Sequence, residues 1–407
     1  MNRASGIIIN ILTVLLFFTF YALNLNVYGS YLFFGLSLVI MLINAFENNG
    51  KIKFSFNNYH KYVLSFALFC LLSSVWAWNR GYSVEKGITI IEVLICMSMI
   101  GTYFFASSDG NDLLKCVKWG GYIVSIYSIF SYGLNGLLRI MQAGERAGTS
   151  YANVNSIAMA CAYTIVIALF FAMRNGFTWT DLLCVPCIIM VVASGTRKAV
   201  LTIAIGVLFM LLFNSKERKS AKNILRVIGI IVVLSLGMYI LARFQLIGGI
   251  SHRMEGLFNF VLGSGKVDSS AIKRGQFIAI GIEQFKDTPI LGIGIGNPRI
   301  LLRNSVYGLD VYLHNNYAEL LAGGGIVGFL FYYSIHWYLL RAFWRRRKTE
   351  AYSLFYIVFI LLLLINDYGS VSYYSKSTYF YFLMMFTYLK RNPEGVVKNA
   401  PEIGENI

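Results

Sequence analysis

Charged residues are scarce in this sequence of 407 residues, where Asp, Glu, Lys and Arg together account for only 13%. A soluble globular domain carries about a quarter of such residues, so that class of protein is excluded. Hydrophobic residues account for 57% and the mean hydropathy is +0.62, which is typical of a chain that lies mostly within a lipid bilayer. Aromatic residues reach 16%, and aromatic rings concentrate at the two surfaces of a membrane.

Several chemical signatures are also missing. The sequence contains no Walker phosphate-binding motif, so an ATP-driven pump is not indicated, and it contains no H-E-x-x-H zinc motif. Few ionisable residues fall within apolar segments, Glu92 being the clearest, which argues against an ion-coupled carrier. The six cysteines include one close pair, Cys184 and Cys187, and we interpret the cysteines as small packing residues rather than a disulfide framework.

Apolar runs of membrane-spanning length recur along the chain. A span needs roughly 20 apolar residues, and about 12 segments come close to this length. They are Ile7–Leu23, Tyr31–Phe46, Tyr62–Trp78, Ile88–Ala106, Val117–Leu134, Ile157–Met173, Leu182–Ala193, Ala199–Phe213, Ile224–Ala242, Ile326–Phe343, Leu354–Ile365 and Tyr379–Leu389. We therefore predict an all-α polytopic membrane protein whose first helix is retained, because no clean signal-peptide cleavage site follows it.

The net charge of +16 has a distribution that indicates membrane topology rather than nucleic-acid binding. If the N-terminus and the C-terminus are cytoplasmic, the inner loops and the tail collect most of the cations, as the positive-inside rule requires. These cations are Lys51, Lys53, Lys61, Lys115, Lys118, Lys216, Arg218, Lys219, Lys222, Arg226, Arg341, Arg345, Arg346, Arg347, Lys348, Lys390, Arg391 and Lys398.

One long segment without a convincing span lies between Ala242 and Ile326, on the predicted extracytoplasmic side. Within it we predict a helix over 271–286, with Arg274 in its first turn, and a second helix that begins near His314. Long loops are usually functional, so we place the catalytic elements here. The predicted organisation is membrane helices in 1–243, the loop in 244–325, membrane helices in 326–390 and a cytoplasmic tail in 391–407.

Three groups on the predicted outer side can carry chemistry. Arg197 lies in the turn Ser194–Lys198 between two spans, where an ordinary interfacial anchor is the alternative interpretation. Arg274 lies at a helix N-terminus, which disfavours cations unless an anionic ligand is shared, although a solvated arginine is as plausible there. His314, at the start of a helix, should be neutral near pH 7 and able to accept a proton, although a lone histidine is more often structural.

A glycine-rich run, Gly292–Asn297, has the spacing of a nucleotide-binding fingerprint. It lacks the strand–helix unit that such a fingerprint requires, so we reject that interpretation. The glycines indicate instead a tightly turned, closely packed backbone.

Four segments in order resemble the O-antigen ligase and O-antigen polymerase superfamily, over about Arg139–Tyr332. Arg146–Asn155 resembles the family's R-x-x-G-x-x-x-x-x-N entry to a span, and Ser194–Arg197 resembles its S-x-[ST]-R turn. Arg274 followed by 289–297 resembles its R…P-x-x-G-x-G-x-G-N loop. His314-Asn315, followed by Leu320 and by Gly325-Ile-Val-Gly328, resembles its H-N…G-x-x-G segment.

The resemblance implies a bacterial inner-membrane glycosyltransferase that takes a glycan from undecaprenyl pyrophosphate, on the outer face, and passes it to an acceptor hydroxyl. It implies no metal and no cofactor. By residue-by-residue match, His314 is the general base and Arg197 and Arg274 stabilise the pyrophosphate leaving group, with inversion at the anomeric carbon. Substrate-binding roles fall to Arg146, Asn155, Asn297 and Asn315. The implied partners are the lipid-linked oligosaccharide, the glycan acceptor, the bilayer, a flippase and a chain-length regulator.

The motifs leave two acceptors open. In a polymerase the acceptor is the end sugar of another lipid-linked repeat unit of O-antigen, capsule or exopolysaccharide; in a ligase it is lipid A–core. We favour the polymerase and expect residues 300–311 to encode acceptor choice, because nothing in that stretch matches the family. A transporter or flippase of lipid-linked sugars is a further alternative, but such proteins usually contain repeated halves and an inward-facing cationic cavity, and the sequence has no repeat.

Overall fold

The computed structural model describes residues 3–23, 25–106, 109–143, 152–213 and 269–392. Every regular element in this part of the chain is a helix, which confirms the predicted all-α class. The long helices of the first half are α1 (Arg3–Ala22), α2 (Val27–Glu47), α3 (Asn58–Leu72), α4 (Arg80–Phe104), α5 (Asp112–Tyr132), α7 (Val154–Asn175), α8 (Cys184–Ser194) and α9 (Arg197–Phe213). The second half adds α12 (Ser269–Asp287), α13 (Pro298–Asn304), α14 (Asn316–Arg346), α15 (Ala351–Asp367) and α16 (Lys376–Arg391), and the short elements are η1 (Ser73–Val75), α6 (Leu134–Ala143) and η2 (Trp179–Leu183).

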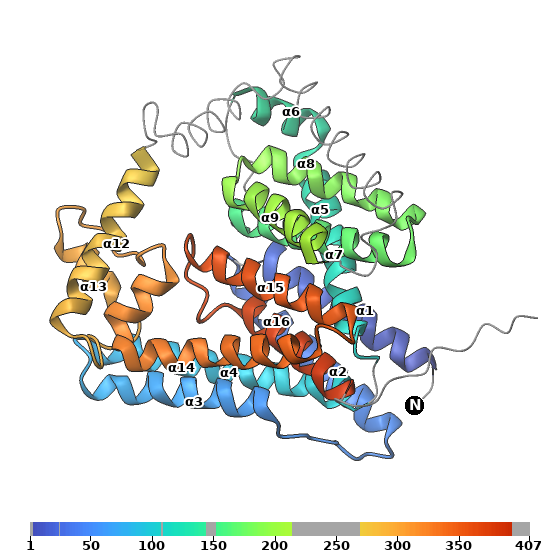
Figure 1. Cartoon of the computed structure of the whole chain (residues 1–407), viewed down its shortest axis with the longest axis horizontal. Coiled ribbons are helices and arrows are strands. Elements are labelled where there is room, and N and C mark those ends of the chain that lie inside the picture. Colours follow the sequence, from blue (N-terminus) through green and yellow to red (C-terminus); the bar gives the residue numbers. More distant parts are fainter. Residues whose placement is uncertain (1–2, 24, 107–108, 144–151, 214–268, 393–407) are drawn as a thin grey trace, which may run out of the picture.

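Each predicted span among the described residues overlaps one of these helices (Figure 1), although Tyr62–Trp78 runs past the end of α3 and through η1. Five helices, namely α1, α2, α4, α7 and α14, are long and apolar enough to cross a membrane. Two shorter apolar helical stretches occur at Trp179–Ser194 and Tyr352–Asp367. The predicted span Ile224–Ala242 lies outside the described residues, so the total of about 12 stays a prediction.

One end of the bundle gathers the segments that we expect in the cytoplasm. The Arg346 guanidinium donates hydrogen bonds to the carbonyls of Leu389 and Asn392. Arg391 donates to the Ala106 carbonyl at 3.1 Å, and the Lys390 ammonium donates to the Ser55 hydroxyl. The loops after α2, α4 and α14 and the end of α16 therefore meet at the same end.

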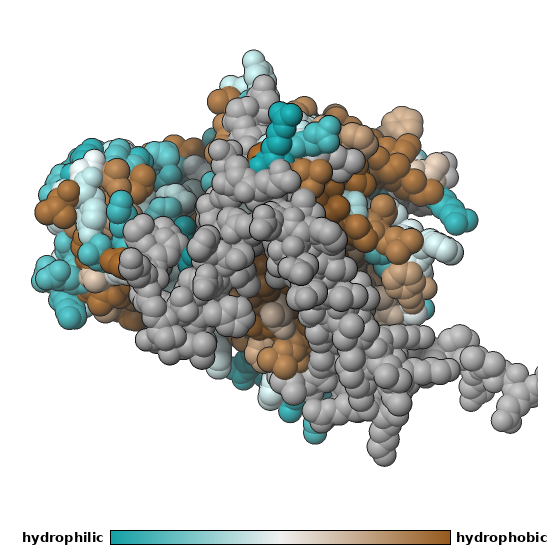
Figure 2. Space-filling view, turned by 90° about the horizontal axis from the view of Figure 1, so that it is seen from above, coloured by the Kyte–Doolittle hydropathy of each residue, from teal (hydrophilic) through white to brown (hydrophobic). Residues whose placement is uncertain are grey.

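The opposite end carries a polar lobe built from α12, α13 and the first turns of α14. These elements share a small apolar core of their own, formed by Phe277, Leu302, Leu313, Ala318 and Ala322. Figure 2 shows hydrophilic residues gathered on this lobe, at the left, and a broad hydrophobic surface on the right of the molecule. The lobe thus has the surface of a domain outside the bilayer, attached to an apolar bundle.

Helix α12 confirms the predicted helix over 271–286 but begins earlier, at Ser269. Arg274 is consequently the sixth residue and lies beyond the first turn, so our prediction of its place in the helix was wrong. Phe277 of this segment is 4% exposed and belongs to the small core. Helix α14 confirms the helix predicted from near His314, beginning at Asn316.

The glycine-rich run threads between η1 and α4 on one side and α14 on the other. The Trp78 amide donates to the Ile293 carbonyl, and the Ile293 amide donates to the Ala322 carbonyl at 3.0 Å. Gly325 interrupts α14 with φ 59° and ψ −165°, and the following amide, Ile326, donates to the Pro289 carbonyl at 2.8 Å. The run is therefore a closely packed backbone, as predicted, and the carbonyls of Pro289 and Ile290 just before it accept the amides that the break in α14 frees.

Replacing Gly294 by alanine should destabilise the protein strongly. Its φ is +95°, and an added Cβ would lie 2.7 Å from the Ala77 Cα. Left-handed backbone alone costs a residue with a side chain roughly 1–2 kcal/mol, and the collision adds to this. Gly308→Ala is the matched control, because Gly308 has φ +59° but open space around it. Thermal unfolding in detergent should show a much larger loss for Gly294→Ala, and equal losses would contradict the close packing.

Candidate active site

His314 occupies a special backbone position at the entry to α14. Its φ is +60°, a left-handed conformation that residues with a side chain rarely adopt. The next residue, Asn315, caps the helix by accepting a hydrogen bond from the Ala318 amide at 2.8 Å. The buried Glu319 carboxylate accepts the Leu313 amide at 2.8 Å. Contacts on both sides therefore hold the backbone of His314 in place, and strain of this kind clusters at functional sites.

Two aromatic rings surround the imidazole of His314. The Phe277 ring of α12 stacks on it, with centroids 6.2 Å apart and an interplanar angle of 19°. The Tyr312 ring lies closer, at 4.4 Å and tilted by 58°. These rings restrict the imidazole and remove water from part of its surface.

Arg274 and Lys198 supply positive charge around this histidine. Burial, followed by the charges of Arg274 and Lys198, lowers the pKa of His314 to about 4. The imidazole is thus neutral at pH 7 and can accept a proton. Arg274 lies one helical turn before Phe277 on α12, and Lys198 is the second residue of α9, so helices distant in sequence bring their charges to one place.

These two cations have no counter-charge of their own in the part of the chain that the structure describes. Neither side chain makes an ion pair or a hydrogen bond there. The carboxylate that acts on the charge of Lys198 is Asp367. Asp367 is 2% exposed and already accepts hydrogen bonds from Asn316, Tyr333 and Ser372, at 3.2, 3.0 and 2.6 Å. The arrangement can therefore receive an anion.

The predicted turn Ser194–Arg197 is formed as expected, between α8 and α9. Gly195 adopts the left-handed conformation that ends α8. The Thr196 hydroxyl donates to the Asn155 side-chain oxygen at 3.1 Å, so the turn contacts the start of α7. Arg197, the first residue of α9, is half-buried. Arg146 lies outside the described residues.

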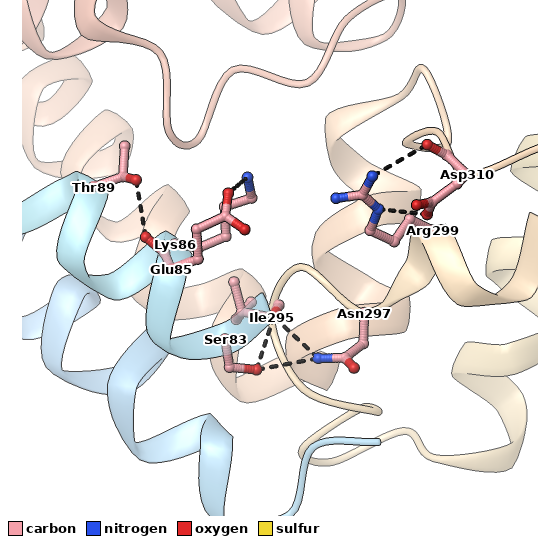
Figure 3. A network of polar contacts seen from close by, with 8 residues as sticks. All are labelled: Ser83, Glu85, Lys86, Thr89, Ile295, Asn297, Arg299 and Asp310. Carbon is pink, nitrogen blue, oxygen red and sulfur yellow. Dashed lines mark hydrogen bonds and ion pairs between the residues drawn. The ribbon is translucent and has the colours of Figure 1, made fainter. Parts of the chain in front are cut away.

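Asn297 and Asn315 have their side chains engaged within the protein. Asn297 is fully buried and accepts the Asn79 amide at 2.6 Å, while its NH₂ group donates to the Ser83 hydroxyl and the Ile295 carbonyl (Figure 3). Asn315 donates to the Tyr368 carbonyl at 3.0 Å in addition to capping α14. Their placement favours a role in fixing the backbone around the site over contact with a glycan.

The stretch 300–311 consists of the end of α13 and a loop after it. Arg299 fixes this loop, because its guanidinium donates hydrogen bonds to the Asp310 carboxylate at 2.7 Å and to the Asp310 backbone carbonyl at 3.2 Å (Figure 3). The Arg299 group also lies over the Tyr82 ring of α4. Val306 at the tip is 96% exposed. The loop is thus a fixed, open surface near His314.

Several residues of the site escaped the sequence analysis. Lys198 was visible beside Arg197, but nothing in the sequence indicated that its side chain would share a site with Arg274 and His314. Asp367 and Phe277 belong to no motif of the sequence, and their place beside these residues follows from packing alone. Among the described residues, no cluster of three or more His, Cys, Asp or Glu could hold a metal ion.

Comparison with known families finds a match that spans the described site residues. The family model described as O-Antigen ligase matches residues 182–333. This segment includes Arg197, Arg274 and His314, and the match confirms the resemblance to the O-antigen ligase and polymerase superfamily. The Arg146–Asn155 segment lies before it. No curated protein matches the chain.

Proposed function

We propose that this protein is a membrane glycosyltransferase that takes a glycan from undecaprenyl pyrophosphate and polymerises repeat units. The observation that carries the proposal is His314 in the polar lobe at one end of an apolar bundle, with its pKa lowered by burial and then by the charge of Arg274, a cation that makes no ion pair within the described residues. A pyrophosphate at a membrane surface supplies the missing negative charge. The family match supports the same class of donor.

The reaction follows from the chemistry of these groups. The acceptor hydroxyl oxygen attacks the anomeric carbon of the donor glycan while His314 takes the hydroxyl proton. The bond between the anomeric carbon and the pyrophosphate oxygen breaks, and its electron pair stays on the pyrophosphate. Arg197 and Arg274 stabilise that charge with the planar fork that pairs with phosphate oxygens. Attack opposite the leaving group inverts the anomeric centre, and no metal enters the scheme.

The site belongs, in this proposal, on the extracytoplasmic side of a bacterial inner membrane, with both termini in the cytoplasm. Two features support this sidedness. The basic loop ends meet at the end of the bundle opposite the lobe, which is the positive-inside arrangement. The lobe is hydrophilic and has its own small core, as expected of a part outside the bilayer.

Binding of the donor should shift the acid limb of the pH profile. In the empty site, burial and two cations lower the pKa of His314 to about 4. A bound pyrophosphate neutralises the charge of Arg274, so the pKa of His314 should rise toward its ordinary value. Because the neutral imidazole is the base, the rate falls as pH drops through that pKa. The acid limb of kcat, which reports the complex, should lie at higher pH than that of kcat/KM for the donor, which reports the free enzyme.

Coincident acid limbs for the two parameters would contradict the proposed contact between the pyrophosphate and the cations beside His314. An Arg274→Gln protein serves as the control. It lacks one of the two cations, so its acid limbs should lie closer together than those of the unchanged protein.

Purified protein in liposomes tests the assignment of activity. With a lipid-pyrophosphate repeat unit as both donor and acceptor, a polymerase forms a ladder of longer glycans. The ligase, the activity for which the matched family is named, forms product only when lipid A–core is added. Transbilayer movement of the lipid-linked sugar without any new glycosidic bond would assign the transporter instead and overturn the proposal.

A further inference from the structure

Lys198 lies where a lysine is unfavourable. It is the second residue of α9, and the positive end of a helix dipole disfavours a cation. Its charge also interacts with the like charge of Arg274 from α12. Burial, then Arg274, lowers the pKa of Lys198 to about 8, and Asp367 offsets this only in part. Removing this charge should therefore stabilise the folded protein when no anion is bound.

The surroundings of Lys198 provide no internal reason to keep an ammonium there. Within the described ranges its side chain makes no ion pair and no hydrogen bond. Asp367, the carboxylate that acts on it, already accepts hydrogen bonds from the side chains of Asn316, Tyr333 and Ser372. The aliphatic stem passes beside Gly369, with its Cδ 3.7 Å from where a Cβ of that residue would lie. An uncharged side chain of similar length would preserve that packing.

We propose that Lys198 is a further pyrophosphate-binding residue, which holds the leaving phosphate opposite Arg274. This inference rests on the proposed function. Arg274 comes from α12 in the polar lobe and Lys198 from α9 in the bundle, so an anion bound by both joins the two parts across His314. The planar fork of Arg274 fixes the orientation of the phosphate, whereas the ammonium of Lys198 acts as a compact point charge.

The test compares Lys198→Met and Lys198→Arg with the unchanged protein, using a short-chain prenyl pyrophosphate as the probe. Binding is measured by calorimetry in detergent, and thermal unfolding is recorded with and without the probe. The methionine keeps the stem and removes the charge. A charge-assisted hydrogen bond is worth roughly tenfold to hundredfold in affinity, so Lys198→Met should lose about that much. Lys198→Arg should bind within a few-fold of the unchanged protein.

Unfolding without the probe separates binding from structure. The Tm of Lys198→Met should equal or exceed that of the unchanged protein, because an unpaired desolvated charge has been removed. The rise in Tm caused by the probe should shrink. Lys376→Met is the matched control, since Lys376 is another partly buried lysine but contacts Ser30 and the Phe33 ring away from the site. It should retain the affinity for the probe.

Three results would overturn a conclusion: the first concerns the proposed function, and the other two concern the role of Lys198. Failure of the unchanged protein to bind the prenyl pyrophosphate would contradict the proposed function itself. Equal affinities of the unchanged protein and Lys198→Met would leave the function standing and refute the role of Lys198. A lower Tm of Lys198→Met without the probe, together with weak binding by Lys198→Arg, would assign Lys198 a structural role and also refute the inference.

Discussion

Replacing His314 by asparagine should reduce glycan transfer by roughly a hundredfold to ten-thousandfold, the usual contribution of a general base. Asparagine is the sharper substitution because the backbone at this position has φ +60°, and asparagine adopts that left-handed conformation readily. The amide cannot accept the proton of the acceptor hydroxyl. Single-turnover transfer from a lipid-pyrophosphate donor measures the chemical step directly.

Donor binding distinguishes a lost base from a damaged fold. The affinity of His314→Asn for a prenyl pyrophosphate should match that of the unchanged protein, because Arg274 and Lys198 remain. His314→Ala should lose transfer as well, but should also unfold at lower temperature, since alanine removes the ring that packs against Phe277 and Tyr312. Transfer by His314→Asn within tenfold of the unchanged protein would remove His314 from the chemistry.

Arg274→Lys should reduce transfer by roughly a hundredfold to a thousandfold even though the charge is kept. A lysine has one ammonium in place of the planar fork that pairs with two phosphate oxygens, and loss of one donor to a developing anion has an effect of this size. The single ammonium also orients the phosphate less well than a planar group that forms two parallel hydrogen bonds. Steady-state kinetics with varied donor should show the loss mainly in kcat.

Arg80→Lys is the control for this substitution. Arg80 is an exposed residue at the start of α4, at the same end of the bundle but outside the proposed site. Its replacement should leave kcat unchanged. An Arg274→Lys protein with the kcat of Arg80→Lys would show that Arg274 does not contact the leaving group.

The helices could be predicted because their determinants are local. Apolar runs such as Ile157–Met173 indicate a helix by length and composition alone, and the structure has α7 there. The helix α12 was also predictable, because Asp268, Ser269 and Ser270 can each cap a helix and Pro289 lies beyond its end. Its start was misplaced because several consecutive polar residues could each cap the helix, and this in turn misplaced Arg274.

The site was predictable only in part, because packing decides it. His314 and Arg274 were candidates by their positions and gained roles through a resemblance, and the structure adds that Phe277, three residues after Arg274, stacks on the imidazole. Asn297 matched a family motif, yet its buried hydrogen bonds to Asn79 and Ser83 depend on a helix far away in the sequence. Lys198 joins the site through the packing of α9, which no local pattern encodes.

The central claim is that a pyrophosphate binds between the cations around His314. A cryo-electron microscopy structure of the full chain in lipid nanodiscs, with a prenyl pyrophosphate bound, tests this most directly. The account predicts phosphate density within hydrogen-bonding distance of Arg274 and Lys198, with the reacting end of the ligand facing His314. Phosphate density elsewhere on the protein, with these side chains left unoccupied, would contradict it.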